Sequence, residues 1–329
     1  MAAAEQLKSL IKSFGDGDEA RFFATAMQIA ASEARKGHST FAQELKKLIE
    51  KAKKERSISF LDQAKTIPIS KPSRELHELI EIFHPKINLN DMILDKEVRS
   101  SLDRIIAEQR KIDLLRRHNL TPKRKLLLTG LPGCGKTMTA QALASELGLS
   151  VFIIRLDGLI SKFMGESIAK LRMIFDAMED HRGVYLFDEF DSIGTQRDQG
   201  QDVGEIKRVL NSFLINIEKD QSNSIVIAAT NMPEALDKAL FRRFDDIIKY
   251  PLPEVKDIES LLEKYLAGFS LTRKNFIRKI ANEALGLSYS DIVRSVEEAI
   301  KEMIILDKHR VSVSSLLKSV QKRNNSKEW

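Results

Sequence analysis

The stretch GLPGCGKT at residues 130–137 has the residue types and spacing of a phosphate-binding loop. Its glycines let the backbone fold around an anion, so that successive N–H groups point inward as donors. Lys136 is expected to reach the β- and γ-phosphates of a nucleotide, and Thr137 to place its hydroxyl on Mg²⁺. An apolar run precedes the stretch and a helical pattern follows it, so a chance glycine-rich loop is the weaker interpretation. We therefore predict a site for ATP and Mg²⁺. Its predicted nucleotide contacts are Gly130, Pro132, Gly133, Cys134, Gly135, Lys136, Thr137 and Met138.

Two carboxylates, Asp188 and Glu189, directly follow the apolar run VYLF. A carboxylate at the end of a buried strand is costly unless it is paired or bound to a metal. Asp188 is therefore expected to hold Mg²⁺ together with Thr137, and Glu189 to polarise the attacking water as a general base. The structural alternative is a pair of buried ion pairs.

A polar residue also ends the next apolar run, SIVIAATN, at Asn231. Its amide is expected to orient the attacking water or to sense the γ-phosphate. The alternative is a structural one, in which Asn231 caps the helical segment MPEALDKAL that follows it.

These residues require a scaffold, and the sequence around them alternates between apolar runs and helical patterns. The runs are KLLLTG (125–130), VFIIRLDG (151–158), GVYLFDEF (183–190), SIVIAATN (224–231) and DIIKYPLP (246–253). Such alternation predicts an α/β fold with a parallel sheet wrapped by helices. After Pro253 the pattern is helical to the end, which indicates a second, all-helical domain.

The chain before this region reads differently. Residues 1–55 have the spacing of three short helices, which predicts a small N-terminal helical bundle. Residues 56–90 contain Pro68, Pro72 and Pro85 and are predicted to be a linker with one short helix near 73–83. The predicted organisation is thus an N-terminal helical domain (1–55), a linker (56–90), a nucleotide-binding α/β core (91–253) and a helical domain with a C-terminal tail (254–329), which the family resemblance described below identifies as a lid.

Composition excludes several classes of protein. No run of eighteen apolar residues predicts a membrane span, and the N-terminal residues lack the pattern of a signal peptide. The single cysteine, Cys134, cannot form an internal disulfide and fits a reducing cytoplasm. The net charge of +6 arises from 53 basic and 47 acidic residues, so it permits contact with nucleic acid without demanding it.

In their order, GLPGCGKT, VYLFDE, Asn231 and the segment NMPEALDKALFRRFDDIIKYPLP (231–253) resemble the AAA+ ATPases, and specifically the classical AAA clade. The resemblance covers about residues 90–310. It implies a five-stranded parallel sheet in the order 5-1-4-3-2 and a helical lid over the nucleotide. It also implies a ring, usually a homo-hexamer, in which a neighbouring chain donates arginine fingers.

The resemblance assigns further residues. Arg242 and Arg243 match the arginine fingers; the structural alternative is that one of them pairs with Asp245 or Asp246. Residues 91–94 resemble the adenine-side segment, and Ile258 is expected to pack on the base. The lid segment GLSYSDIVRSVEEAI (286–300) carries no arginine in its early positions, as in a clade without a lid arginine.

The family places a substrate-gripping loop after its second strand, and here Phe163, Met164 and Gly165 match its aromatic–apolar–glycine pattern. An aromatic ring can grip a polypeptide by apolar contact without reading its sequence, and the glycine lets the loop move. The alternative is a buried Phe163 beneath the next helix. Residues 194–204 are expected to form a second pore loop or a plain connection.

These features predict an ATPase that remodels or unfolds protein substrates by threading polypeptide through a ring. The alternative is a DNA-directed or regulatory AAA+ switch ATPase. A scaffold that binds ATP without hydrolysis is disfavoured, because Glu189, Asn231 and both arginines are present. The sequence contains no H-E-x-x-H or G-x-S-x-G protease motif. A small helical head on one ATPase module resembles short prokaryotic AAA proteins that work with a separate serine protease.

Overall fold

The structure is a computed structural model that describes residues 79–159, 166–194, 203–269 and 276–325, together with residues 25–27, 29, 30, 42, 43 and 47. The chain divides into two compact units, Met1–Ser70 and Lys71–Trp329. In the first unit the few described residues are helical. The predicted N-terminal bundle and most of the predicted linker lie outside the described residues. None of the described helices is both long enough and apolar enough to cross a membrane.

The second unit is built on a six-stranded sheet with the spatial order β1-β3-β4-β5-β2-β6. Its strands are Ile80–Phe83 (β1), Lys125–Gly130 (β2), Val151–Ile154 (β3), Val184–Phe187 (β4), Ile225–Thr230 (β5) and Asp246–Tyr250 (β6). The strands β2 to β6 are parallel where they pair, and their order is the predicted 5-1-4-3-2. The predicted α/β fold is confirmed, but the sheet has six strands where five were predicted, because β1 adds an antiparallel strand at one edge.

The strand β1 corrects one prediction. The sequence predicts a short helix near 73–83 within a linker, but Ile80–Phe83 forms an edge strand antiparallel to β3. Leu79 and Ile80 are buried, and the Leu79 carbonyl accepts a hydrogen bond from the Arg155 N–H at 2.9 Å. Pairing with β3 satisfies backbone groups at the sheet edge, and this tertiary gain outweighs the local helical preference.

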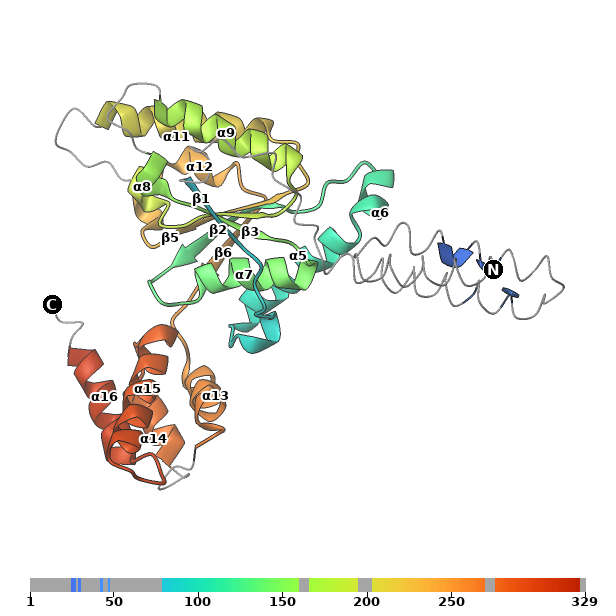
Figure 1. Cartoon of the computed structure of the whole chain (residues 1–329). Coiled ribbons are helices and arrows are strands. Elements are labelled where there is room, and N and C mark those ends of the chain that lie inside the picture. The colour runs from blue at the N-terminus through green and yellow to red at the C-terminus, as the bar shows by residue number, and fades with distance from the viewer. Residues whose placement is uncertain are drawn as a thin grey trace. The chain divides into compact units, whose positions relative to one another are not determined.

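Helices cover both faces of the sheet (Figure 1). They are Lys96–Arg110 (α5), Ile112–Arg117 (α6), Lys136–Leu147 (α7), Leu156–Leu159 (α8), Glu166–Asp180 (α9), Asp191–Gly194 (α10), Val203–Lys219 (α11) and Lys238–Phe241 (α12), with 3₁₀ turns at Leu89–Asp91 (η1) and Pro233–Ala235 (η2). On one face, Phe175 of α9 and Phe213 of α11 pack on Phe187 of β4, with the Phe187 and Phe213 ring centroids 5.1 Å apart. On the other face, α5 and α7 bury Leu102 and Leu143 against the strands.

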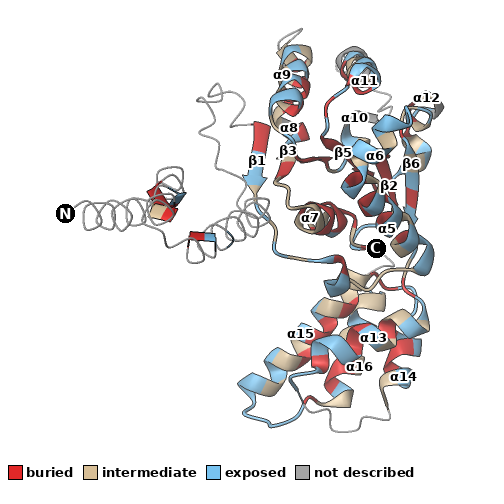
Figure 2. Ribbon diagram, turned by 90° about the vertical axis from the view of Figure 1, so that its right-hand side faces the viewer, coloured by how far each residue is buried: buried red, intermediate tan, exposed pale blue. Residues whose placement is uncertain are grey.

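A separate helical region follows β6, where the sequence predicts the lid, and we call it the lid region. It contains Val255–Leu266 (α13), Ile277–Glu283 (α14), Tyr289–Ile305 (α15) and Val313–Asn325 (α16). Their inward faces share an apolar core of their own, visible as the buried residues of these helices in Figure 2. The lid helix α15 begins at a capping box: Ser288 accepts from the Asp291 N–H, and the Asp291 carboxylate accepts from the Ser288 N–H.

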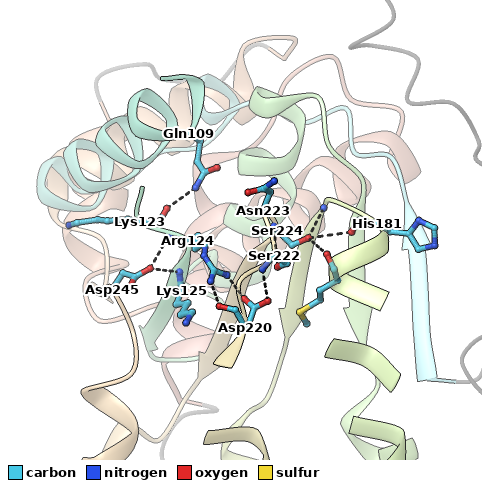
Figure 3. Close-up of polar contacts among 12 residues, drawn as sticks. Gln109, Lys123, Arg124, Lys125, His181, Asp220, Ser222, Asn223, Ser224 and Asp245 are labelled. Atoms are coloured by element: carbon cyan, nitrogen blue, oxygen red, sulfur yellow. Dashed lines mark hydrogen bonds and ion pairs between the residues drawn. The ribbon is translucent and has the colours of Figure 1, made fainter. Parts of the chain in front are cut away.

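The amino-terminal ends of β2 and β5 meet in a polar cluster, which Figure 3 shows. The guanidinium of Arg124 contacts both the carboxylate and the carbonyl oxygen of Asp220, whose side chain is only 2% exposed. Asp220 also accepts from the Ser222 N–H at 3.0 Å. Asp245 accepts from the N–H groups of Arg124 and Lys125, both at 2.9 Å. The charges of Arg124, Asp220 and Asp245 are therefore satisfied by other groups of the protein.

Candidate functional site

The glycine-rich loop connects β2 to α7 at the carboxyl edge of the sheet. Gly135 has φ of +96°, in the left-handed region, and α7 begins at the next residue, Lys136. A Cβ on Gly130 would lie 2.4 Å from the Tyr250 carbonyl oxygen, so only glycine fits beside β6. The loop therefore leads directly into a helix N-terminus, an arrangement that favours anions.

Lys136 is held by polar groups of the loop and of β5's end. Its Nζ donates to the carbonyl oxygens of Gly130 (2.7 Å) and Leu131 (2.9 Å), and to the Asn231 Oδ1 (2.8 Å). Burial lowers the pKa of the Lys136 ammonium, while nearby Cys134, Asp188 and Asp191 oppose that shift. A negatively charged phosphate entering the site would favour the charged form of this lysine.

Thr137 and Asp188 meet across the site. The Thr137 hydroxyl donates to Asp188 Oδ2 at 2.6 Å, and Asp188 Oδ1 accepts from the Glu189 N–H at 2.9 Å. Asp188 forms no ion pair within the described part of the chain, so the buried-ion-pair alternative is not what the structure shows for it. A hydroxyl and a carboxylate are the hard oxygen donors that suit Mg²⁺, so the residues present fit that ion.

Glu189 directly follows Asp188 and has an exposed side chain that lines the same space. Its backbone has φ of +49°, an uncommon value for a residue that is not glycine. Such strain costs free energy and is typical of functional sites.

Asn231 is fixed at the end of β5 by Asp191. The Asp191 Oδ1 accepts from the Asn231 N–H at 3.1 Å and from the Thr230 hydroxyl at 3.0 Å. The following 3₁₀ turn, η2, has Met232 as its N-cap residue and no side-chain cap. The N-cap alternative for Asn231 is therefore wrong, since its side chain accepts from Lys136 instead.

One cavity of about 540 Å³ gathers most of the predicted site. The predicted residues that line it are Pro132, Gly133, Cys134, Gly135, Lys136, Thr137, Met138, Asp188, Glu189 and Asn231. From the predicted adenine-side segment, Asp91, Met92 and Ile93 line it as well. The glycine-rich loop, the carboxylates and the asparagine, which are far apart in the sequence, thus meet at one place.

Several predicted residues do not line this cavity. Gly130 lies at the end of β2 beside Tyr250, where it permits the close approach of two strands. Ile258 is fully buried in the lid core, because it lies on the inward face of α13. Leu261 and Tyr265 of the same helix line the cavity in its place.

Sequence reasoning missed the residues that the lid contributes. They are Leu261, Tyr265, Tyr289, Ser290, Val293, Arg294 and Glu297. Tyr289, Val293 and Glu297 are spaced four residues apart, as one face of α15 requires, so helical spacing within 286–300 was the available signal. The early positions of that segment lack an arginine, but Arg294 does line the cavity.

The two candidate finger arginines differ in their surroundings. Arg243 donates to the Ala239 carbonyl at 2.8 Å and lies 3.3 Å from the Glu218 carboxylate. Arg242 has an exposed side chain, and neither arginine lines the cavity of its own chain. The alternative that one of these arginines pairs with Asp245 or Asp246 is wrong. Asp245 accepts from backbone N–H groups, and Asp246 pairs with Lys123.

The predicted substrate loop, Phe163, Met164 and Gly165, lies outside the described residues. So do residues 195–202, which form most of the predicted second loop.

Comparison with known proteins identifies the family. Residues 126–252 match the family described as ATPase family associated with various cellular activities (AAA). A relative from Sinorhizobium fredii, named uncharacterized AAA family ATPase y4kL, is 33% identical over 321 residues, which are 98% of this chain and 95% of the relative. The chain belongs to the AAA family, and it is an ATPase with a nucleotide-binding domain.

Other relatives share only part of their length with this chain. An ATP-dependent zinc metalloprotease FtsH from Lancefieldella parvula is 30% identical over 71% of this chain and 37% of the relative. A proteasome-activating nucleotidase from Methanosphaerula palustris is 29% identical over 71% of this chain and 59% of the relative. The chain thus spans about a third to three fifths of these two proteins.

Proposed function

We propose that the chain works as a ring, with six copies the expected number, in which ATP hydrolysis drives the remodelling of protein substrates. The observation that carries this proposal is the contrast between Glu189 and Arg242. Glu189 lines the cavity, whereas Arg242, in the segment that matches the family's arginine fingers, is exposed and lies away from it. This contrast supports a role for Arg242 on the nucleotide of a neighbouring chain.

The residues of the cavity divide the chemistry among them. Thr137 and Asp188 would hold Mg²⁺, which neutralises charge on the phosphates when it is bound. Lys136 adds a positive charge at the phosphates. Glu189 accepts a proton from the attacking water as general base, and Asn231, fixed by Asp191, orients that water. Arg242 of a neighbour stabilises the negative charge that spreads over the phosphoryl group in the transition state.

The remodelling of protein is supported by the resemblance of Phe163, Met164 and Gly165 to a substrate loop and by the names of two relatives. Those names couple nucleotide use to proteolysis: one relative is an ATP-dependent metalloprotease and the other a proteasome-activating nucleotidase. This sequence has no H-E-x-x-H motif. Any cleavage of its substrates is therefore assigned to a separate protease, for which a serine protease is the candidate.

The ring is tested by the solution mass of the Glu189→Gln protein with and without ATP and Mg²⁺. Without a general base the nucleotide stays bound, and ATP bridges neighbouring chains through Arg242. We expect a shift from a smaller species to about six chains. As a matched control, Glu189→Gln combined with Arg242→Ala should bind ATP and assemble less. A protein that stays monomeric with saturating ATP would contradict the ring and leave the nucleotide site standing.

The threading of substrate is tested by Phe163→Ala. Because the ring of Phe163 is proposed to grip substrate and not nucleotide, ATP turnover should stay within about twofold while unfolding of a tagged test protein is lost. Phe269, an exposed phenylalanine after α13, offers a control: Phe269→Ala should leave both activities intact. Full unfolding activity in Phe163→Ala would remove the threading proposal.

A further inference from the structure

The first turn of the lid helix α15 rests directly on the phosphate-binding loop. The Ser290 N–H donates to the Gly133 carbonyl oxygen at 3.1 Å. A Cβ on Gly133 would lie 2.6 Å from Ser288 Oγ and 2.9 Å from Ser290 Cβ, so the two segments are in close contact. Tyr289 stands between these two serines, and its position is therefore tied to the loop that surrounds the phosphates.

The hydroxyl of Tyr289 is an unsatisfied polar group. Its oxygen is buried and has no hydrogen-bond partner among the described residues. Two other buried atoms share this condition, Gln109 Oε1 and Arg323 Nε, but neither of those residues lines the cavity. A buried hydroxyl without a partner costs free energy, so its presence requires an explanation.

The surroundings of this hydroxyl keep it in its neutral form. Burial raises the pKa of Tyr289, and the nearby acidic groups of Asp257, Cys134, Asp95 and Glu254 raise it further. At neutral pH the group is therefore a phenol, which can both donate and accept one hydrogen bond.

The cavity offers two kinds of wall. The loop residues, Lys136 and the carboxylates form a polar end suited to phosphates and their metal. The remainder includes five apolar or aromatic residues, Met92, Ile93, Leu261, Tyr265 and Val293, together with the polar Asp91, Ser290, Arg294 and Glu297. Tyr289, Ile93 and Val293 each pack against the lid core and each line the cavity, so Tyr289 belongs to this second wall, where the base and ribose of a nucleotide fit.

We propose that Tyr289 is a specificity-determining residue for the nucleoside half of the nucleotide, and that its hydroxyl finds its hydrogen-bond partner only when a nucleoside fills the cavity. The inference rests on the nucleotide site proposed above. Because the oxygen is covered, the bond requires a shift of the first turn of α15, which carries Ser290 and its contact with Gly133. Nucleoside binding and lid position are then linked through one side chain.

The test is Tyr289→Phe, measured in two ways on the full chain. The nucleotide-free protein should melt at the same temperature as the wild type or higher, because the substitution removes a polar group that has no partner there. The Kd for ATP should rise about tenfold, because the loaded site loses a hydrogen bond. The Kd for inorganic tripolyphosphate with Mg²⁺, which has phosphates and no nucleoside, should not change.

Tyr185→Phe is the matched control. The Tyr185 hydroxyl lies 2.8 Å from the His181 carbonyl and 3.1 Å from the Ala177 carbonyl, in the core between β4 and α9. Removing the Tyr185 hydroxyl should lower the melting temperature and leave the Kd for ATP unchanged.

Three outcomes would overturn the role of Tyr289. They are an unchanged Kd for ATP in Tyr289→Phe, a lower melting temperature of its nucleotide-free form, and an equal loss of affinity for ATP and tripolyphosphate. A wild-type protein that binds neither ligand would instead refute the proposed nucleotide site, so the two failures are distinguishable.

Discussion

The two edges of the sheet carry similar residue types in opposite conditions. At the amino-terminal edge, the partly buried Arg124 and the buried Asp220 satisfy each other, and Asp245 is satisfied by backbone N–H groups. At the carboxyl edge, Glu189 is exposed and lines a cavity, and the lid residue Tyr289, which lines the same cavity, has a buried hydroxyl without a partner among the described residues. The same sheet thus has one edge whose polar groups serve stability and another whose polar groups are available to a ligand.

The largest effect is expected from Glu189→Gln at the carboxyl edge. Loss of the general base should lower ATP turnover by about 10²–10⁴-fold, with ATP binding retained. Because the side chain is exposed and the backbone is unchanged, the melting temperature of the nucleotide-free protein should stay the same. Steady-state hydrolysis, nucleotide binding and thermal melting together measure this. If the variant hydrolyses ATP nearly as fast as the wild type, Glu189 is not the general base and another residue must act as the base.

Asp220→Ala at the amino-terminal edge is expected to have a smaller effect, and on stability instead of on catalysis. Removing one partner leaves the buried Arg124 charge unpaired, which should cost about 3 kcal/mol in the free energy of unfolding. The KM for ATP should stay unchanged, because Asp220 lies at the other end of the strands. Urea unfolding and steady-state kinetics measure the two effects.

The control for that change is the double variant Arg124→Met, Asp220→Leu. Replacing both charges by apolar groups should recover much of the lost stability, since no unpaired charge remains buried. If Asp220→Ala instead changed the KM strongly, the two edges would be coupled and the contrast between them would fail.

Local signals predicted the core of the site and the central sheet. The glycine-rich loop, the carboxylates after β4 and Asn231 after β5 each stand at the end of an apolar run, and the carboxyl ends of parallel strands meet at one edge. The sequence pattern alone was therefore enough to predict that these residues lie near one another, as they do around the cavity. The parallel order of β2 to β6 came from the family resemblance, and the structure confirms it.

Features that depend on tertiary packing were not predicted. The strand β1 has only four residues, and it forms because β3 offers a free edge. On α13, spacing could not tell whether Ile258 or Leu261 faces the cavity, because the lid core decides which side is inward. The contact of Arg243, in the turn after α12, with Glu218 of α11 joins residues 25 positions apart, and no local pattern reports it.

The edge strand also has a mechanical consequence. The chain that precedes residue 79 joins the sheet through β1, so a pull applied along that chain loads β1 before any other strand of the sheet. β1 is paired residue by residue with β3, from Ile80 opposite Ile154 to Phe83 opposite Val151, so the load on β1 passes to β3 through this pairing. Because β3 continues into α8 and then residues 160–165, tension from the N-terminal side is delivered to the strand that leads to the proposed substrate loop.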